Sequence, residues 1–474
     1  MKGMLKKMKK LLCLGICCLL LLAGCAPHEH QYIDTVIPPT CTEMGYTVHT
    51  CACGETYYSD YRTTSTHSFG SWIVGVAATL TEGGEEYRLC KSCGYLQTRG
   101  TGNTSALPKV YLSSQGSVFY SHGELHFTCD SNARTEEGKP EIQLLFTKNG
   151  SLFPVDLGWG EKSAYRLDPC IPDLTYARAA AAQVLWDACA QLRISAGQAP
   201  EWIPSLIGGG FPVQVYRDDV YLGLYRLTPP LGDWAYTFPG YQGSPTAVFR
   251  SNLHSPECLF TTNPVFDEEG FVLQYCSSES TEWAKKSFEK FSHFIRTASD
   301  EDFKEGLSHY TDLTALMDQF LLTVLFGSGE GDTAGMLWST ADGKHWVPSF
   351  SPLHTAYGLR TDGRQSASTL GVPPPAEEGG VAYTGENLLW QRLCALFGEE
   401  LQTRYAQLRA TVLRSPALLY RSFAEQQKEI EAGLLELEKE LLPAYSQSAV
   451  TGEAIENYIK NRLSAMDLWM ASGE

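Results

Sequence analysis

The sequence predicts an α+β protein in which two small cysteine-containing repeats precede one large domain. Segments rich in β-branched and aromatic residues follow one another from Val110 onward. Segments with helical spacing of apolar residues dominate from residue 279 to the end. Strands that come first and helices that come later are typical of an α+β domain. The 474 residues, 43% hydrophobic and 19% charged, suffice for a sizeable globular core.

The first 24 residues have the order of an export signal. Lysines precede a short apolar run over residues 11–22, and the Leu-Ala-Gly-Cys sequence ending at Cys25 resembles a bacterial lipobox. The run is short for a spanning helix, which needs about 20 apolar residues. We therefore expect residues 1–24 to be a lipoprotein signal peptide and Cys25 to be lipidated. The protein would then be anchored in the cell membrane on its extracytoplasmic face. An ordinary secretory signal or an uncleaved anchor is the alternative.

The chain is acidic, with a net charge of −17. From Cys25 onward it carries 32 basic and 54 acidic side chains, a net charge of −22. Such an excess repels phosphate backbones and anionic lipid, which argues against nucleic-acid binding. Solubility alone is a sufficient reason for the acidity.

Residues 25–66 and 67–99 look like two copies of one small unit. The first contains TCTEMGYTVHTCACG and the second TLTEGGEEYRLCKSCG, which align so that Cys51 falls opposite Cys90. Both resemble the small TCTExGxxxxxCxxCG repeats found in surface proteins of many anaerobic bacteria. Units of this size cannot bury enough surface unaided, so we expect stapled modules that act as a spacer or a binding module.

The cross-link that stabilises these repeats could be a structural zinc site. Zinc binds four cysteine or histidine ligands in a tetrahedron, and Cys-x-x-Cys before glycine presents two thiolates on one turn. The first repeat offers Cys41, Cys51, Cys53 and one histidine from among His30, His49 and His67. The second offers Cys90 and Cys93 with His67, but Leu80 replaces its first cysteine. A disulfide is the alternative, either between Cys90 and Cys93 or between Cys41 and a neighbour.

The stretch 100–108 is small, polar and uncharged, and it is predicted to be a linker. The large domain then occupies residues 109–474. A strand is predicted over 139–146, and a hairpin over 214–227 that turns at Asp218 and Asp219. Helices are predicted over 175–193, 279–297, 312–326, 386–413, 416–442 and 453–470.

Several segments of the large domain together resemble the spore coat protein H (CotH) kinase family. The segment DPCIPDLTYAR is similar to a family element that opens a helix, with Asp173 and Arg178 in the matching places. VQVYRDDVYLGLYRLT is similar to the family's central hairpin. Residues 312–346 are similar to the helix, loop and strand that follow, and residues 455–470 to the closing helix.

The resemblance implies an atypical protein-kinase fold that uses ATP with Mg²⁺ or Mn²⁺ to phosphorylate protein side chains. Phosphoryl transfer needs a lysine or arginine on the phosphates and carboxylates that hold the metal. Lys139, in a predicted strand, is the candidate for phosphate binding, with Lys148 and Lys162 as competitors. Glu330 and Asp332 are the candidates for a catalytic carboxylate.

The sequence departs from the family at its acidic positions. Pro229 stands where the family's hairpin ends in glutamate, and the run ending in His354 stands where the family has a W-D-x-D loop. Losing these carboxylates together is hard to compensate, since magnesium prefers oxygen ligands. We therefore expect a pseudokinase-like domain that binds or scaffolds a surface protein or glycan at the cell or spore surface. An active kinase with relocated carboxylates, and an adhesin or cell-wall-binding protein, are the alternatives.

Overall fold

The chain forms two compact units, residues 1–104 and 105–474, separated within the predicted linker. The computed structural model describes residues 29–131, 139–196, 210–229, 245–251, 258–327, 336–350, 353–368, 372, 387–446 and 452–472. In this described part of the chain, none of the helices has the length and apolar character needed to cross a membrane.

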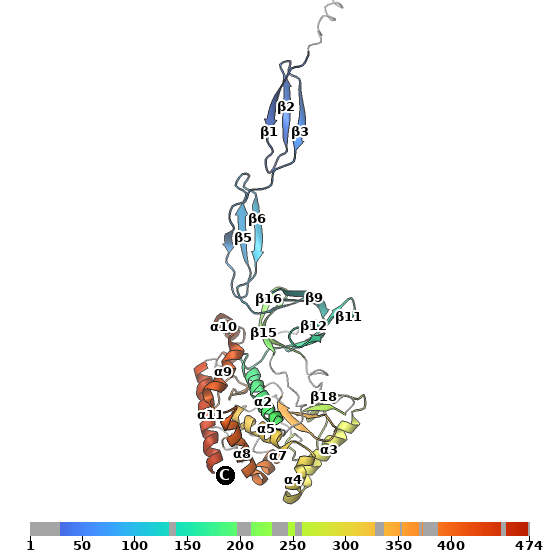
Figure 1. Ribbon diagram of the computed structural model, residues 1–474, viewed down its shortest axis with the longest axis vertical. Coiled ribbons are helices and arrows are strands. Elements are labelled where there is room, and N and C mark those ends of the chain that lie inside the picture. The colour runs from blue at the N-terminus through green and yellow to red at the C-terminus, as the bar shows by residue number, and fades with distance from the viewer. Residues whose placement is uncertain are drawn as a thin grey trace, which may run out of the picture. The chain divides into compact units, whose positions relative to one another are not determined.

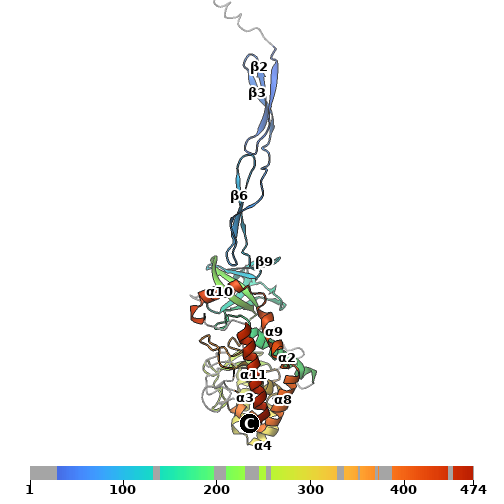
Figure 2. The same ribbon diagram turned by 90° about the vertical axis from the view of Figure 1, so that its left-hand side faces the viewer.

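Each repeat is a three-stranded antiparallel meander, with its middle strand paired to both neighbours (Figures 1 and 2). The strands are β1 (Tyr32–Ile37), β2 (Gly45–Cys51) and β3 (Thr56–Arg62) in the first repeat, and β4 (Ile73–Val76), β5 (Gly84–Leu89) and β6 (Leu96–Thr101) in the second. The shared topology agrees with the duplication seen in the sequence.

The repeats contain almost no apolar core. Across residues 29–104, all of which the structure describes, the only buried hydrophobic side chains are those of Cys51 and Cys90. The aromatic side chains lie at the surface, where for example Tyr32 and Tyr57 pack edge to face with ring centres 4.9 Å apart. Small sheets without a packed face are marginally stable in water, so another interaction must hold these strands in place.

The first part of the large unit is a seven-stranded β-barrel. Its strands follow the order β10-β14-β16-β15-β7-β8-β9, and β9 pairs back with β10 to close the barrel. The interior is filled by side chains such as Val110, Leu144, Val215 and Tyr225. The strands are β7 (Lys109–Leu112), β8 (Ser117–His122), β9 (Leu125–Ser131), β10 (Ile142–Lys148), β14 (Ala164–Asp168), β15 (Phe211–Arg217) and β16 (Val220–Thr228), with β11 (Ser151–Leu152) added beside β10 and a small hairpin of β12 (Val155–Asp156) and β13 (Glu161–Lys162).

The predicted hairpin is confirmed as β15 and β16. Asp218 and Asp219, its turn residues, have φ angles of 45° and 66°. Two consecutive left-handed residues match the twist of the paired strands, and aspartate tolerates this conformation better than most residues.

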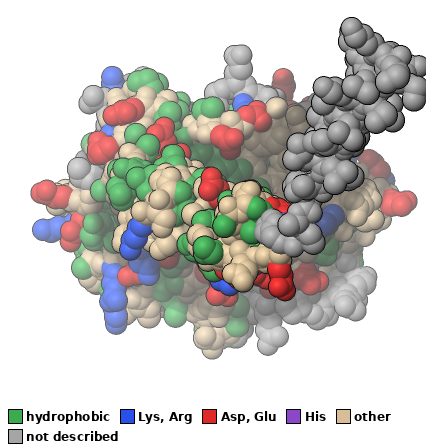
Figure 3. Space-filling model, turned by 90° about the horizontal axis from the view of Figure 1, so that it is seen from above, with side chains coloured by type: hydrophobic (Ala, Val, Ile, Leu, Met, Phe, Trp, Pro, Cys, Tyr) green, Lys and Arg blue, Asp and Glu red, His purple; other side chains and the backbone are tan. Residues whose placement is uncertain are grey.

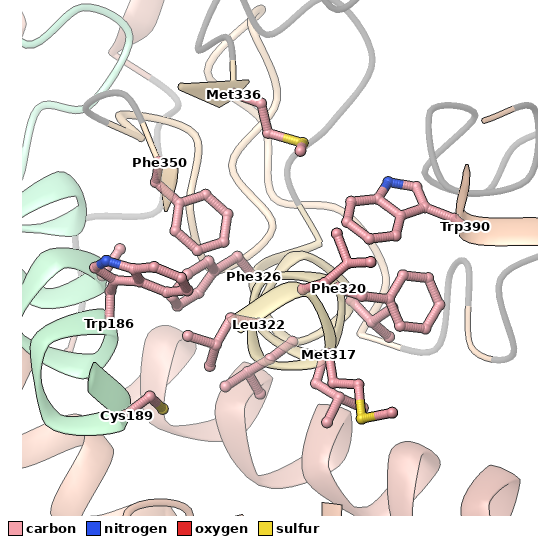
Figure 4. Close-up of a cluster of buried hydrophobic side chains, with 14 of the residues drawn as sticks. Trp186, Cys189, Met317, Phe320, Leu322, Phe326, Met336, Phe350 and Trp390 are labelled. Atoms are coloured by element: carbon pink, nitrogen blue, oxygen red, sulfur yellow. The ribbon is translucent and has the colours of Figure 1, made fainter. Parts of the chain in front are cut away.

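The rest of the large unit is a helical body around a four-stranded antiparallel sheet, and helix α5 (Leu313–Phe326) lies at its centre. Every side chain from Ala315 to Phe326 is buried. Figure 4 shows Trp186, Phe350 and Trp390 around this helix. The sheet contains β18 (Phe271–Cys276), β17 (Ala247–Ser251), β19 (Met336–Thr340) and β20 (Val347–Phe350); the other helices are α2 (Arg178–Ser195), α3 (Glu282–Thr297), α4 (Asp300–Gly306), α7 (Leu388–Leu396), α8 (Gly398–Ala410), α9 (Pro416–Gln427), α10 (Ala432–Leu441) and α11 (Gly452–Ser472).

The structure corrects three predicted element boundaries. The helix predicted over 386–413 is two helices, because the chain turns at Phe397, whose φ of −126° is not helical. The helix predicted over 416–442 is also two, α9 and α10, separated at Lys428–Glu431. Lys139 lies before β10, which begins at Ile142, and not within a strand.

The surface is mixed in character. On the face seen in Figure 3, hydrophobic side chains lie between acidic and basic ones. This mixture is ordinary for a folded protein, since much of any protein surface is apolar.

Candidate metal centre

Four ligand-type side chains from the two repeats converge on one point. Cys41, His67, Cys90 and Cys93 each offer one sulfur or nitrogen atom, and these four atoms lie within 4.8 Å of one another. Cys41 Sγ is 3.8 Å from Cys90 Sγ, and Cys93 Sγ is 3.4 Å from His67 Nδ1. We call these four residues the inter-repeat cluster.

A tight turn before the middle strand of each repeat fixes the position of its second residue. In the first repeat, Thr40 Oγ1 accepts a hydrogen bond of 2.9 Å from the backbone N–H of Glu43, and Cys41 lies within this turn. In the second repeat, Thr79 Oγ1 accepts the equivalent bond from Glu82. Threonine hydroxyls commonly bond to the backbone in such turns. The Thr-x-Thr-Glu sequence therefore presents Cys41 at one end of its repeat.

The turn after β5 presents Cys90 and Cys93 together. Gly94, at a φ of +72°, donates its N–H to the Cys90 carbonyl oxygen at 2.9 Å. The backbone N–H groups of Cys93 and Ser92 also hydrogen-bond to the Cys90 sulfur, which lowers the pKa of the Cys90 thiol to about 5. The thiolate that these amides favour is the form that binds metal.

Cys41 has the opposite shift. Its pKa is raised to about 11, first because its thiol hydrogen-bonds with Cys93 and also because it is partly desolvated. The raised pKa favours the protonated thiol at Cys41. A divalent ion bound there would displace the proton of this thiol, because it binds cysteine as thiolate.

The spacing of the cluster fits a tetrahedral zinc ion. Sulfur ligands at about 2.3 Å from zinc lie about 3.8 Å apart in a tetrahedron, and a sulfur and an imidazole nitrogen lie about 3.6 Å apart. The corresponding distances here are 3.8 Å for Cys41–Cys90 and 3.4 Å for Cys93–His67. Three cysteines and one histidine are a common ligand set of structural zinc sites.

The cysteine sulfurs of the cluster are not at disulfide distance in this structure. The eleven cysteines within the described ranges are all free thiols. The 3.8 Å between the sulfurs of Cys41 and Cys90 is well beyond a bond of about 2.05 Å. The separation suits two thiolates on one ion.

The structure groups the ligands differently from the sequence analysis. Cys41 was grouped with Cys51 and Cys53, but it lies in the site of the second repeat. Strand β2 separates the two ends of the first repeat, and its seven residues span about 20 Å. Cys41 therefore cannot reach Cys51. For the same reason Leu80 costs the second repeat no ligand, since positions 80 and 90 lie at opposite ends of β5.

A second cluster, His30, Cys51 and Cys53, lies in the first repeat, and we call it the terminal cluster. Cys53 Sγ is 3.4 Å from His30 Nδ1, the same distance as in the inter-repeat cluster. Glu55 Oε2 lies 3.0 Å from His30 Nε2. A carboxylate on the outer nitrogen commonly orients a metal-binding imidazole. The terminal cluster thus has three candidate ligands, and its Cys–His pair has the same spacing as that of the inter-repeat cluster.

His49, one of the candidate ligands, has other partners. Its Nδ1 lies 2.6 Å from Asp34 Oδ1 and its Nε2 lies 2.7 Å from Ser59 Oγ. Its ring also stacks on Tyr57, with ring centres 4.3 Å apart. These contacts make His49 a cross-strand tie in the first repeat.

The lysine proposed for phosphate binding is sealed inside the large unit. The Lys139 side chain is 6% exposed, and its ammonium group donates to the Glu438 carboxylate and the Tyr176 hydroxyl. Glu438 is fully buried on α10 and also accepts the backbone N–H of Leu224 at 2.6 Å. Burial lowers the pKa of Lys139, although the Glu438 charge opposes this shift. No sequence pattern indicates that Glu438 is the partner of Lys139, because the two residues are 299 positions apart.

Asp173 and Arg178, which match the family's helix-opening element, are buried and hold neighbouring backbone in place. Asp173 Oδ2 accepts the backbone N–H of Arg178 at 3.0 Å at the start of α2. Arg178 in turn donates to the carbonyl oxygens of Ala356 and Tyr357, at 2.9 and 3.1 Å. This arginine therefore holds the loop that carries His354.

His354 is paired with Asp168 through a contact of 3.1 Å between Nε2 and Oδ2. Arg166 lies 3.3 Å from the same carboxylate oxygen, and the backbone N–H of Cys170 donates to the other at 2.9 Å. Burial disfavours a charged imidazole, but the Asp168 charge outweighs it, so the pKa of His354 is raised well above its usual value. The pKa of Asp168 is lowered, because His354 and Arg166 outweigh the effect of burial.

The pair predicts a stability maximum at mildly acidic pH. The Asp168 contribution is present above the unfolded pKa of about 4 and is lost as pH falls. The His354 contribution is full below the unfolded pKa of about 6.5 and is lost as pH rises toward the higher folded value. We expect His354→Gln to flatten the fall in melting temperature above pH 6.5. His309→Gln, at an exposed histidine, is the control, and equal pH dependence in both variants would contradict the assignment.

Several predicted positions fall outside the described residues. These are Cys25, Glu330 and Asp332. Pro229 is described and buried at the end of β16.

No family model matches the chain, and no curated protein matches it.

Proposed function

We propose that the chain is a surface-anchored binding protein whose two repeats form a zinc-pinned module ahead of the large domain. The observation that carries this proposal is the inter-repeat cluster, which lies in a segment without an apolar core. One ion bound by both repeats supplies the cross-link that small sheets need. The lipid anchor at Cys25 and the extracytoplasmic location belong to the same proposal and rest on the signal sequence.

We infer that the large domain, which resembles the CotH kinase family, acts by binding and not by phosphoryl transfer. Lys139 is held by Glu438 inside the fold, and His354, at a position of a family carboxylate, is held by Asp168. A proline stands at another such position, Pro229. These features support a scaffold for a protein or glycan partner at the cell or spore surface.

Metal analysis of the full-length chain, purified in detergent without added chelator, tests the zinc-pinned module. We expect two zinc ions per chain, one at the inter-repeat cluster and one at the terminal cluster. The ion at the inter-repeat cluster, which has four candidate ligands, should stay bound to the protein during gel filtration. A metal-free chain that has lost two titratable thiols would indicate a Cys41 disulfide and contradict the proposal.

Thermal unfolding with nucleotide tests the non-catalytic assignment. A ligand at about 100 times its dissociation constant adds about 2.7 kcal/mol to the free energy of unfolding. We expect no rise in melting temperature with millimolar ATP and Mg²⁺ or Mn²⁺, because Lys139 is already paired. A metal-dependent rise that Lys139→Met abolishes, while Lys162→Met preserves it, would instead favour an active kinase.

A further inference from the structure

A cationic hollow lies along the exposed side of helix α3. It has a volume of about 570 Å³ and is lined by Lys286, Lys290, His293 and Arg296, with Glu289 and the loop residues 263–264 completing its wall. This volume is within the range of about 300–1,000 Å³ found for ligand pockets.

Helical spacing gathers these basic side chains into one row. Positions 286, 290 and 293 are four and three residues apart, so their side chains lie on one face of α3. The opposite face carries Phe288, Phe291 and Ile295, which are buried in the core. From Lys286 to Arg296 the row is about 15 Å long, with the first two charges about 6 Å apart, at 1.5 Å per residue.

The cations in the hollow are not neutralised within the fold. In the described parts of the chain, Lys286, Lys290 and Arg296 make no ion pair, although their helix neighbour Lys285 pairs with Glu282 at 3.6 Å. The Arg296 Nε is buried from water and has no hydrogen-bond partner among the described groups. A buried donor without a partner costs free energy that a ligand oxygen would recover.

The overall charge makes this row unusual. From Cys25 onward the chain has a net charge of −22. Unpaired cations concentrated in one hollow of so acidic a protein form a local field opposite to the global one, and such a field attracts and orients anions.

We propose that this hollow binds a linear polyanion in which charged groups alternate with hydroxylated units, such as a phosphate-linked polyol or sugar chain. The inference deepens the proposed binding function of the large domain and rests on it. The length of the row fits successive anionic groups better than one small anion. Glu289 and the Asn263 amide would accept hydrogen bonds from hydroxyl groups between the charges, a role for which a bare phosphate has no use.

The test uses the full-length chain in detergent and follows binding of fluorescent poly(glycerol phosphate). The double variant Lys286→Glu/Lys290→Glu should bind about tenfold or more weakly. The matched control Lys304→Glu/Lys460→Glu makes the same charge change at exposed lysines on α4 and α11, and it should bind like the wild type. Binding should also weaken when salt is raised from about 50 to 300 mM.

Three further probes define the ligand. Neutral dextran and inorganic phosphate should both compete poorly. Dextran offers hydroxyl groups without charge, and phosphate offers charge without hydroxylated units. A single-stranded oligonucleotide that competes better than poly(glycerol phosphate) would overturn the ligand class.

Failure of this inference can be separated from failure of the proposed function. Equal binding by both double variants, or no binding by the wild type, would overturn the hollow as the site. The proposed function fails on different readouts, namely the zinc content of the repeats and a melting-temperature response to ATP. Equal melting temperatures of the two double variants would show that lost binding is not lost folding.

Discussion

Cys41→Ser is expected to abolish tight zinc binding at the inter-repeat cluster, although the other three residues of that cluster belong to the second repeat. The structure places its sulfur 3.8 Å from that of Cys90, at the far end of β2 from the cysteines of its own repeat. Structural zinc in small domains contributes about 10–16 kcal/mol of apparent binding free energy, so the loss of one thiolate should have a large effect. The segment 29–104 should then become sensitive to proteolysis.

Cobalt spectroscopy of the full-length chain measures this effect directly. Tetrahedral Co²⁺ bound by thiolates absorbs in the visible range, and the wild type should show a chelator-resistant signal. Cys41→Ser should lose that signal, whereas Cys53→Ser, in the terminal cluster, should retain it. Leu80→Ser is the matched control at the equivalent turn and should behave as the wild type. Loss of the same signal in both Cys41→Ser and Cys53→Ser would restore the grouping made from sequence.

The terminal cluster should hold its metal more weakly than the inter-repeat cluster. It has three ligands among the described residues, and the fourth position would be open to solvent or to another ligand. Stepwise addition of a chelator should therefore release one metal equivalent well before the second. Release of both in a single step would contradict the difference in ligand number.

Local patterns predicted the local structure well. The hairpin at Asp218 and Asp219 and the central helix α5 follow from turn residues and apolar spacing within short windows. The barrel did not follow, because its closure depends on β9 pairing with β10 across an intervening loop. The parallel pairing of β7 with β15 likewise joins segments about a hundred residues apart, with no signal in either.

The metal centre was partly accessible from sequence. The residue types Cys41, Cys90, Cys93 and His67 were identified, but grouping by repeat assumed that a unit binds its own metal. Strand length alone contradicts that assumption, since β2 places Cys41 and Cys51 at opposite ends of the repeat. The partners of buried charges were not accessible, because nothing near Lys139 in the sequence indicates Glu438.

Glu438→Gln is expected to lower the free energy of unfolding by about 3–5 kcal/mol, the usual effect of leaving one member of a buried ion pair alone. Glu438 is fully buried, holds Lys139, and accepts the backbone N–H of Leu224. Without the Glu438 charge, the Lys139 ammonium of the variant should lose its proton more readily, so its pKa in the folded state should fall further. Because the unfolded state would then bind more protons, the stability of the variant should rise with pH toward about 10. Thermal and urea unfolding between pH 7 and 10 measure both effects.

Glu436→Gln is the matched control, since Glu436 lies on the same helix, is 68% exposed and pairs with Lys439 at the surface. It should change stability by less than about 0.5 kcal/mol. The double variant Lys139→Met/Glu438→Gln should recover much of the loss, because no buried charge is then left without a partner and the glutamine oxygen can still accept the Leu224 N–H. If Lys139 instead served a nucleotide, Lys139→Met would weaken ATP binding and leave the melting temperature unchanged. Stability and nucleotide binding thus separate a lysine that holds α10 in place from one that holds phosphate.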